Sequence, residues 1–318
     1  MKKLTTLAAF TALALSGGAF AQNYPTKPIT LISMHTGVAD GYTRLMVGKM
    51  AESIGQPIVV DQRLGAGGAI AAEAVARAAP DGYTLLASFP DAMVNRHTLV
   101  KNVPYDTVRD FTAITQLADP NIILAVAPGV ANDLKDYLAK AKAQPGKIGY
   151  GSLGIGSSFH FAGEALKQIA GVDLLHVPFK QSADAVVAVQ RGDLASLFTA
   201  QGVALPQHRA GKLRIIAMVN DRRSPAMPDV PAIREVVQGF ESPPYWLGYF
   251  GPAQLPRPVV QRLNAEFVKA AKLPEIDNRA NEIGFTTIGS SADEFSAKVK
   301  RDIEKVNSIA KFAGIVPE

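Results

Sequence analysis

Residues 149–160 read GYGSLGIGSSFH, and this stretch decides the fold class. A short strand over 147–150 runs through a glycine- and serine-rich loop directly into a helix over 159–170. A strand, a tight glycine-rich turn and a helix in this order form one unit of an α/β fold. The same alternation recurs on both sides of this stretch. The sequence therefore predicts an α/β protein with parallel strands covered by helices.

Runs of β-branched and aliphatic residues predict the strands, and alanine-rich segments between them predict the helices. The expected strands are 29–32, 58–60, 83–86, 122–126, 147–150, 174–177, 195–199, 213–219 and 245–250. The expected helices are 41–53, 68–79, 134–142, 159–170, 182–191, 257–271, 274–283 and 291–313. We expect two lobes, each a mainly parallel sheet flanked by helices. Lobe 1 is expected to comprise 22–122 and 249–318, and lobe 2 to comprise 123–248.

The first 21 residues predict a secretory signal peptide. Lys2 and Lys3 are followed by an apolar run over 4–15, and the segment ends Ala19-Phe20-Ala21. This order of charge, apolar run and small-residue cleavage pattern is typical of export signals, and we expect cleavage after Ala21. The apolar run is shorter than the roughly 20 residues that a membrane span needs. The sequence therefore predicts a periplasmic protein, for which cytosolic nucleotide chemistry is unexpected.

Composition narrows the function further. The chain has no cysteine, so its stability must come from its core and not from disulfides. Basic residues are mixed with acidic ones and form no arginine-rich stripe, which argues against a nucleic-acid partner. The five histidines show no metal-ligand spacing, and we expect neither a metal nor a cofactor.

The loop over 151–158 is the strongest candidate site. Backbone N–H groups at the start of a helix carry partial positive charge, and glycines allow an anion to approach them closely. Ser152, Ser157 and Ser158 add hydroxyl donors, so the loop predicts a cradle for a carboxylate or phosphate. Ordinary capping of the helix by Ser157 or Ser158 is the alternative. The glycine spacing also matches a dinucleotide fingerprint, but Asp173 lies before its strand, where it cannot meet a ribose.

Other local patterns carry weaker predictions. The glycines of 65–68 are expected to allow close packing of a helix on the sheet, and contact with an anion is the alternative. Asp40 is expected to cap the helix that follows the first strand. Tyr245 and Trp246 could line a pocket or belong to the core. A serine hydrolase using Ser157 and His160 is an alternative function, although the G-x-S-x-G pattern is absent at Ser157.

Many short segments together resemble one family. They are 24–29, 55–57, 61–68, 79–86, 104–106, 110–111, 150–160, 176–180, 209–214, 223–225 and 228–231. The chain resembles the substrate-binding receptors of tripartite tricarboxylate transporters, the Bug family, over essentially all of the exported part. The resemblance implies a two-lobe Venus-flytrap fold of type II. It also implies a monomer that captures a small organic carboxylate and docks on membrane permease subunits.

The resemblance also implies which residues bind the ligand. Carried over by position, they are Met34, His35, Thr36, Gly37, Ser88, Phe89, Ser152, Gly154, Ile155, Gly156, Ser157, Ser158, His160 and Thr199. The loop after the first strand is shorter than the family pattern, and Thr199 stands where the family usually has Asp or Asn. The family resemblance predicts a di- or tricarboxylate. Together with bulky Leu153 and Ile155, these departures favour a dianionic ligand with an apolar middle, such as an aromatic dicarboxylate. A ligand sensor for a signalling partner remains an alternative to a transport receptor.

Overall fold

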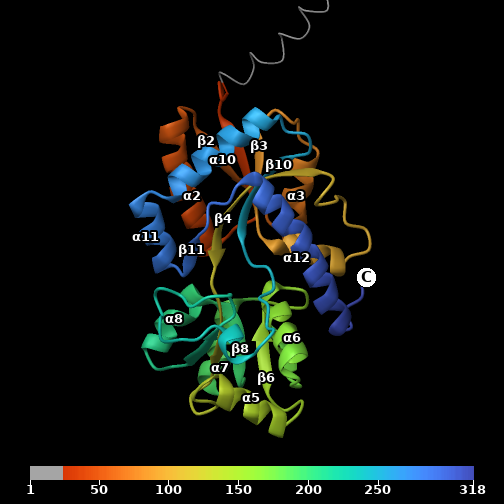
Figure 1. The fold of residues 1–318 in the computed structure, drawn as a ribbon, viewed down its shortest axis with the longest axis vertical. Helices are drawn as coiled ribbons and strands as arrows, with labels where there is room; N and C mark the ends of the chain where they lie inside the picture. Colours follow the sequence, from red (N-terminus) through yellow and green to blue (C-terminus); the bar gives the residue numbers. More distant parts are fainter. Residues whose placement is uncertain (1–23) are drawn as a thin grey trace, which may run out of the picture.

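The computed structural model describes residues 24–318, so the expected signal peptide over 1–21 lies outside the described part. Two mixed sheets flanked by helices are stacked along the long axis of the molecule (Figure 1). The six-stranded sheet is the centre of lobe 1, and the five-stranded sheet is the centre of lobe 2. No helix among residues 24–318 combines the length and apolar character that crossing a membrane would require.

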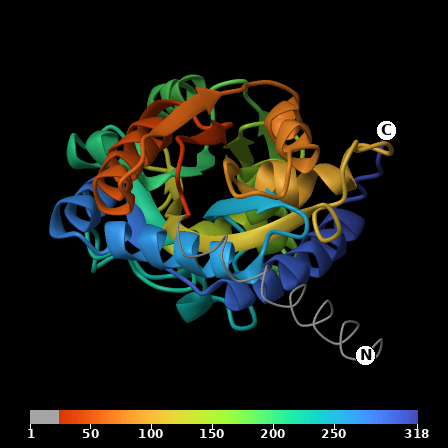
Figure 2. The ribbon, with the colours of Figure 1, turned by 90° about the horizontal axis from the view of Figure 1, so that it is seen from above.

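Lobe 1 contains strands from both ends of the described chain. Its strand order is β11 (Phe285–Thr287), β4 (Phe111–Pro120), β10 (Leu247–Pro252), β3 (Thr84–Ser88), β1 (Ile29–Ser33) and β2 (Ile58–Gln62). The apolar residues of α2 (Gly37–Ile54), α10 (Arg257–Ala271) and α11 (Pro274–Glu282) share one core cluster with this sheet. Residues of α3 (Ala69–Ala76) and α12 (Ala292–Phe312) belong to the other cluster. Figure 2 looks down on this lobe, with helices around the strands.

Lobe 2 follows the same plan. Its strand order is β7 (Leu175–Pro178), β6 (Gly149–Ser152), β8 (Ser196–Ala200), β5 (Ile122–Val126) and β9 (Arg214–Met218). Helices α5 (Leu134–Ala143) and α6 (Ser158–Ala170) pack in one core cluster, and α7 (Ser182–Arg191) and α8 (Gln201–Arg209) pack in another. The short elements are α4 (Pro90–Met93), α9 (Ile233–Val236) and the 3₁₀ turns η1 (Ala66–Gly68) and η2 (Asn95–Thr98).

Both sheets are mixed because the chain returns through each of them in the opposite direction. The strands β1, β2 and β3 are parallel to one another, whereas β10 runs antiparallel to β3 and β4. In lobe 2, β6, β7 and β8 are parallel and β5 runs antiparallel to β8 and β9. The two-lobe α/β architecture expected from the sequence is confirmed, with parallel strand groups completed by antiparallel return strands.

Several local expectations need correction. The ten-residue strand β4 and helix α8 were not expected; threonine and glutamine interrupt the apolar pattern of β4, and α8 contains Gly202 and Pro206. Helix α2 begins at Gly37 with Thr36 as its N-cap, so the expectation that Asp40 caps it is wrong. Asp40 lies in the first turn, where its Oδ2 accepts from Arg44 Nε at 2.8 Å. A carboxylate in the first turn still stabilises the helix through the dipole.

Candidate functional site

The carboxyl ends of the parallel strands meet at the boundary between the lobes. Strand β4 ends at Pro120 and β5 begins at Ile122, so these two residues mark the boundary. Gly248 near the start of β10 pairs with Ser88 at the end of β3, and Ser33 at the end of β1 pairs with Ala87. On the other side, Ala200 at the end of β8 pairs with Ile122. Since β6 runs parallel to β8, the loop after β6 also faces lobe 1, as expected for a ligand site.

The loop after β1 is supported by a buried histidine. The His35 ring is fully buried, with Nδ1 3.1 Å from Thr43 Oγ1 and its centroid 4.4 Å from that of Phe89. Its main-chain oxygen accepts from Gln62 Nε2 at 2.5 Å. Burial lowers the pKa of His35 to about 3, so the ring is neutral and shapes the loop instead of supplying a positive charge.

The other expected residues of lobe 1 differ in accessibility. Ser88 is fully buried, and its hydroxyl lies 3.2 Å from Met34 Sδ. Thr36 and Gly37 are exposed, and Phe89 and Met34 are half-buried. The close packing expected of the glycines over 65–68 is confirmed at Gly68, where a side chain would collide with Met34 Sδ. Thr36 and Gly37 are therefore accessible to a ligand, and Met34 and Phe89 are accessible in part.

The loop after β6 uses most of its own donors. Ser157 caps α6 by accepting from His160 N at 3.2 Å, and its hydroxyl donates to Gly154 O at 2.8 Å. Gly156 N donates to His160 Nδ1 at 3.1 Å, and Gly154 N donates to Ser152 Oγ at 3.1 Å. Ser157 therefore acts as the N-cap of α6, which was the alternative to anion binding at this residue. Ile155, at 63% exposure, extends from the loop into solvent.

A buried polar network lies behind this loop. Ser152 Oγ is 2.6 Å from His176 Nε2, and the rings of His176 and His160 are 4.1 Å apart. Burial lowers the pKa of His160 to about 3. The Ser157 hydroxyl donates to a carbonyl and not to the imidazole, and His160 Nδ1 is occupied by a backbone N–H. Ser157 and His160 are therefore not arranged as a nucleophile and its base.

Some buried polar atoms at the boundary lack a partner. Within residues 24–318, no hydrogen bond reaches Thr199 Oγ1, Asn95 Oδ1, Gln201 Nε2 or His35 Nε2. Thr199 lies at the end of β8 and His35 follows the end of β1, so both atoms are close to the strand ends that face the boundary. Buried polar groups of this kind are normally satisfied by ordered water or by a ligand.

Tyr245 and Trp246 have different roles. Trp246 is fully buried and its Nε1 donates to Asp302 Oδ2 at 2.9 Å, so it belongs to the core. Tyr245 is half-buried between the lobes: its ring stacks on Phe89 at 5.6 Å and lies 5.2 Å from Phe159. Phe89 of lobe 1, Tyr245 of the segment that returns to lobe 1, and Phe159 of lobe 2 thus form a continuous row of aromatic rings.

Sequence reasoning missed two residues of the boundary, Asp91 and Asn95. Asp91 Oδ1 and Oδ2 lie 3.3 and 3.4 Å from the Ser158 N and Oγ, and Asn95 Nδ2 donates to Ser158 Oγ at 3.1 Å. These bonds connect lobe 1 to the first turn of α6. Residues 67 positions apart carry no local signal of such a contact, so a single sequence could not reveal it.

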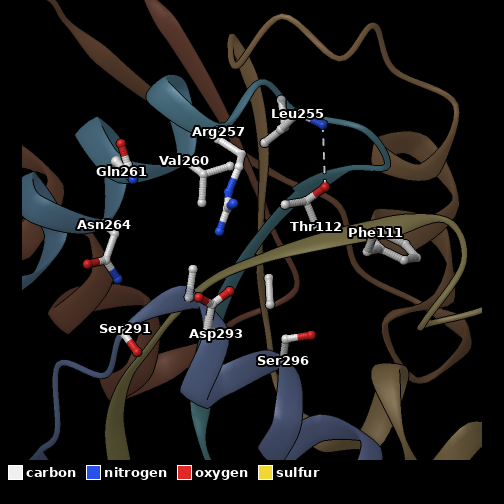
Figure 3. Close-up of a pocket in the computed structure, with 12 residues that line it drawn as sticks. Phe111, Thr112, Leu255, Arg257, Val260, Gln261, Asn264, Ser291, Asp293 and Ser296 are labelled. Atoms are coloured by element: carbon white, nitrogen blue, oxygen red, sulfur yellow. Dashed lines mark hydrogen bonds between the residues drawn. The ribbon is translucent and has the colours of Figure 1, made fainter.

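Several cavities among residues 24–318 lie away from the expected residues. One of about 430 Å³ is lined by α10, by the start of α12 and by the edge of β4, where Arg257 and Asp293 extend toward each other (Figure 3). Another, of about 360 Å³, lies beside the chain crossings and is lined by Asn121 and Tyr245 among others. None of these cavities is lined by an expected ligand residue, whereas the strand ends and their loops are the place where those residues lie.

Comparisons with known proteins identify the family of the chain. Residues 42–315 match the family model described as "Tripartite tricarboxylate transporter family receptor". The chain is 34% identical over 287 residues to the "UPF0065 protein in tcbD-tcbE intergenic region" of Pseudomonas sp. (strain P51), covering 89% of this chain and 85% of that protein.

Two solved structures are similar over nearly the whole chain. Rpa4515 of R. palustris, with adipate, is 28% identical with a TM-score of 0.80, covering 93% of this chain and 100% of that one. MatC of Rhodopseudomonas palustris, with bound malate, is 27% identical with a TM-score of 0.74, covering 90% and 99%. These findings confirm the resemblance read from the sequence, and they describe a solute-binding protein instead of an enzyme. The chain belongs to the family of tripartite tricarboxylate transporter receptors, and it is a periplasmic solute-binding receptor.

Proposed function

We propose that the protein captures a small organic carboxylate between its lobes and delivers it to the membrane subunits of a tripartite tricarboxylate transporter. The observation that carries this proposal is the meeting of the β1, β3, β6 and β8 carboxyl ends at one boundary, with unpaired buried polar atoms beside them. Open α/β sheets bind ligands at such ends. The adipate and malate bound by the two similar proteins support a carboxylate as the ligand class.

The ligand would lie between the loop over 34–37 and the loop over 152–158. We propose that accessible backbone and hydroxyl groups of Thr36 and Gly37 hold one carboxylate, with Phe89 providing apolar contact. Thr199 Oγ1, buried and unpaired, would donate to the ligand or to a water beside it. His35, Ser88, His160 and Ser157 would act by fixing the shapes of the two loops, since their polar atoms are buried or used within the loops.

The remaining parts of the proposal concern the whole receptor. Lobe 1 would comprise 22–122 and 249–318 and lobe 2 would comprise 123–248, and the lobes would close on the ligand as a monomer by movement at the two crossings. The exported form would begin at Gln22. Di- and tricarboxylates, including aromatic ones, are the ligands expected from the family resemblance.

A thermal-shift screen tests the proposal. The purified protein is unfolded and refolded to remove any carried-over ligand, and then mixed with monocarboxylates, aliphatic and aromatic dicarboxylates, tricarboxylates and amino acids. A ligand at about 100 times its dissociation constant stabilises the folded state by about 2.7 kcal/mol, which raises Tm by several degrees. A selective shift with organic acids is expected. A shift with none of them would overturn the carboxylate assignment.

A further inference from the structure

The first turn of α6 already holds a carboxylate that the chain itself supplies. Asp91, in the short helix α4 of lobe 1, reaches across the boundary to Ser158 at the first position of α6. Its Oδ1 accepts from Ser158 N at 3.3 Å and its Oδ2 accepts from Ser158 Oγ at 3.4 Å. Ser158 is only 1% exposed, so this contact is shielded from solvent on the side of lobe 2.

Asp91 occupies the position that an anion would take. The start of a helix attracts negative charge because its first N–H groups lack partners within the helix. Here Ser158 N donates to Asp91, His160 N donates to the Ser157 hydroxyl, and Ser157 N donates to Gly154 O at 3.2 Å. Most donors that could have received a ligand carboxylate at this end are therefore already used.

Two further contacts hold lobe 1 against the start of α6 beside Asp91. Asn95 Nδ2 donates to the same Ser158 hydroxyl, and Leu99 packs against Gly156 so closely that a side chain there would collide with it. Burial raises the pKa of Asp91, and hydrogen bonds from Ser158 act in the opposite direction by stabilising the carboxylate. A second carboxylate brought to this end would meet a like charge in a partly desolvated place.

We propose that Asp91 is a specificity-determining residue that fills the anion position of lobe 2, so that the cleft selects ligands with one carboxylate over ligands with a second carboxylate at the α6 end. This inference rests on the proposed function, because it concerns the same cleft. Within the proposed class of small organic carboxylates, it favours monocarboxylates and departs from the di- and tricarboxylates that the family resemblance suggests. The single ligand carboxylate would face lobe 1, and the opposite end of the ligand would be uncharged.

Isothermal titration with ligands of matched length tests the inference. The affinity for hexanoate is compared with that for adipate, and the affinity for butyrate with that for succinate. The refolded exported form, beginning at Gln22, is used. The wild type is expected to bind the monocarboxylate of each pair more tightly. Asp91→Asn keeps the size of the side chain and an oxygen that can accept from Ser158 N, but removes the charge. It is expected to shift the affinity ratio toward the dicarboxylate by about tenfold, equivalent to about 1.4 kcal/mol.

Two further variants make the result specific. Glu304→Gln removes one negative charge at an exposed position of α12 and is expected to leave the ratio unchanged. Asp91→Ser removes the same charge in a different way and keeps the test available if the Asn variant does not fold. Tighter binding of dicarboxylates by the wild type, or an unchanged ratio in both Asp91 variants, would overturn the inference and leave the receptor function standing. Failure of the wild type to bind any acid would instead overturn the proposed function.

Discussion

At the residue scale, buried histidines make stability depend on pH. His35 is fully buried and its pKa is lowered to about 3, whereas an unfolded histidine titrates near 6.5. Between these values the unfolded chain binds a proton that the folded chain does not, so the free energy of unfolding falls as the pH falls. The slope from one such group is about 1.4 kcal/mol per pH unit.

The first prediction concerns this slope. Replacing His35 with Asn removes the titrating group. Between about pH 4 and 6, the slope of the unfolding free energy against pH should therefore be smaller in the variant than in the wild type, by about 1.4 kcal/mol per pH unit. Urea titrations at several pH values measure it, and the difference from wild type cancels the contributions of other groups, such as Asp119, whose pKa is raised by burial to about 6. Equal slopes in both proteins would show that His35 is protonated in the folded state.

The second prediction concerns the cap of α6. Ser157→Ala removes the oxygen that accepts from His160 N, and we expect the unfolding free energy to fall by about 1 kcal/mol. Ser308→Ala, at an exposed position inside α12, is the control and should cost nothing, because alanine favours the helix interior. If Ser157→Ala kept full stability but abolished binding of organic acids, the hydroxyl would be a ligand contact instead of a cap.

At the element scale, a third prediction compares two glycines of the loop after β6. Gly156 and Gly154 have φ angles of +77° and +99°, so alanine at either position carries backbone strain. A side chain at Gly156 would collide with Leu99 of lobe 1, whereas nothing lies within 4 Å of one at Gly154. Overpacking of this kind costs about 1 kcal/mol or more.

Gly156→Ala should therefore weaken binding of an organic acid by about fivefold more than Gly154→Ala does, a difference of about 1 kcal/mol. The reason is that the added methyl group pushes η2 away from the loop and opposes lobe closure. Titration calorimetry measures the affinities, and small-angle scattering of the liganded variants measures the compactness. Equal affinities in the two variants would show that the loop and Leu99 separate when the ligand binds.

The elements differ in how far the sequence could predict them. Strand β5 and helices α7 and α10 have the expected limits, because an unbroken apolar or amphipathic run ends at a proline, glycine or charged residue. Strand β4 was missed because its ten residues alternate threonine and glutamine with apolar residues, and its burial comes from neighbours that lie far away in sequence. Its pairing with β10, over a hundred residues later, exists only in the folded chain.

The candidate site shows the same limit. The strand–loop–helix pattern predicted which loops follow the strands, and both loops do lie at the lobe boundary. The pattern could not reveal that the Ser157 hydroxyl and Gly154 N donate hydrogen bonds within the loop. Nor could it reveal that Asp91 of the opposite lobe accepts a hydrogen bond from Ser158 N. Such contacts depend on side-chain direction and on the relative position of the lobes, which local periodicity does not encode.

At the scale of the whole molecule, one apolar cluster connects the lobes. Ile32 and Leu86 of lobe 1 belong to the same buried cluster as Leu124 and Phe161 of lobe 2. Trp246, the single tryptophan of the chain, lies in this cluster on the segment that returns from lobe 2 to lobe 1. Because the core is continuous, separation of one lobe would expose apolar surface of the other.

The last prediction is that the lobes unfold together. The Trp246 indole is fully buried and bonded to Asp302, so its fluorescence should shift to the red when the cluster opens. In urea, the fluorescence transition and the far-ultraviolet circular dichroism transition should share one midpoint, as cooperative unfolding requires. Two separated midpoints would mean that the lobes are independent folding units joined only at the crossings. Val219→Ala shortens a buried side chain of the same cluster in lobe 2. If the lobes unfold together, this variant should lower the midpoints of both transitions by the same amount.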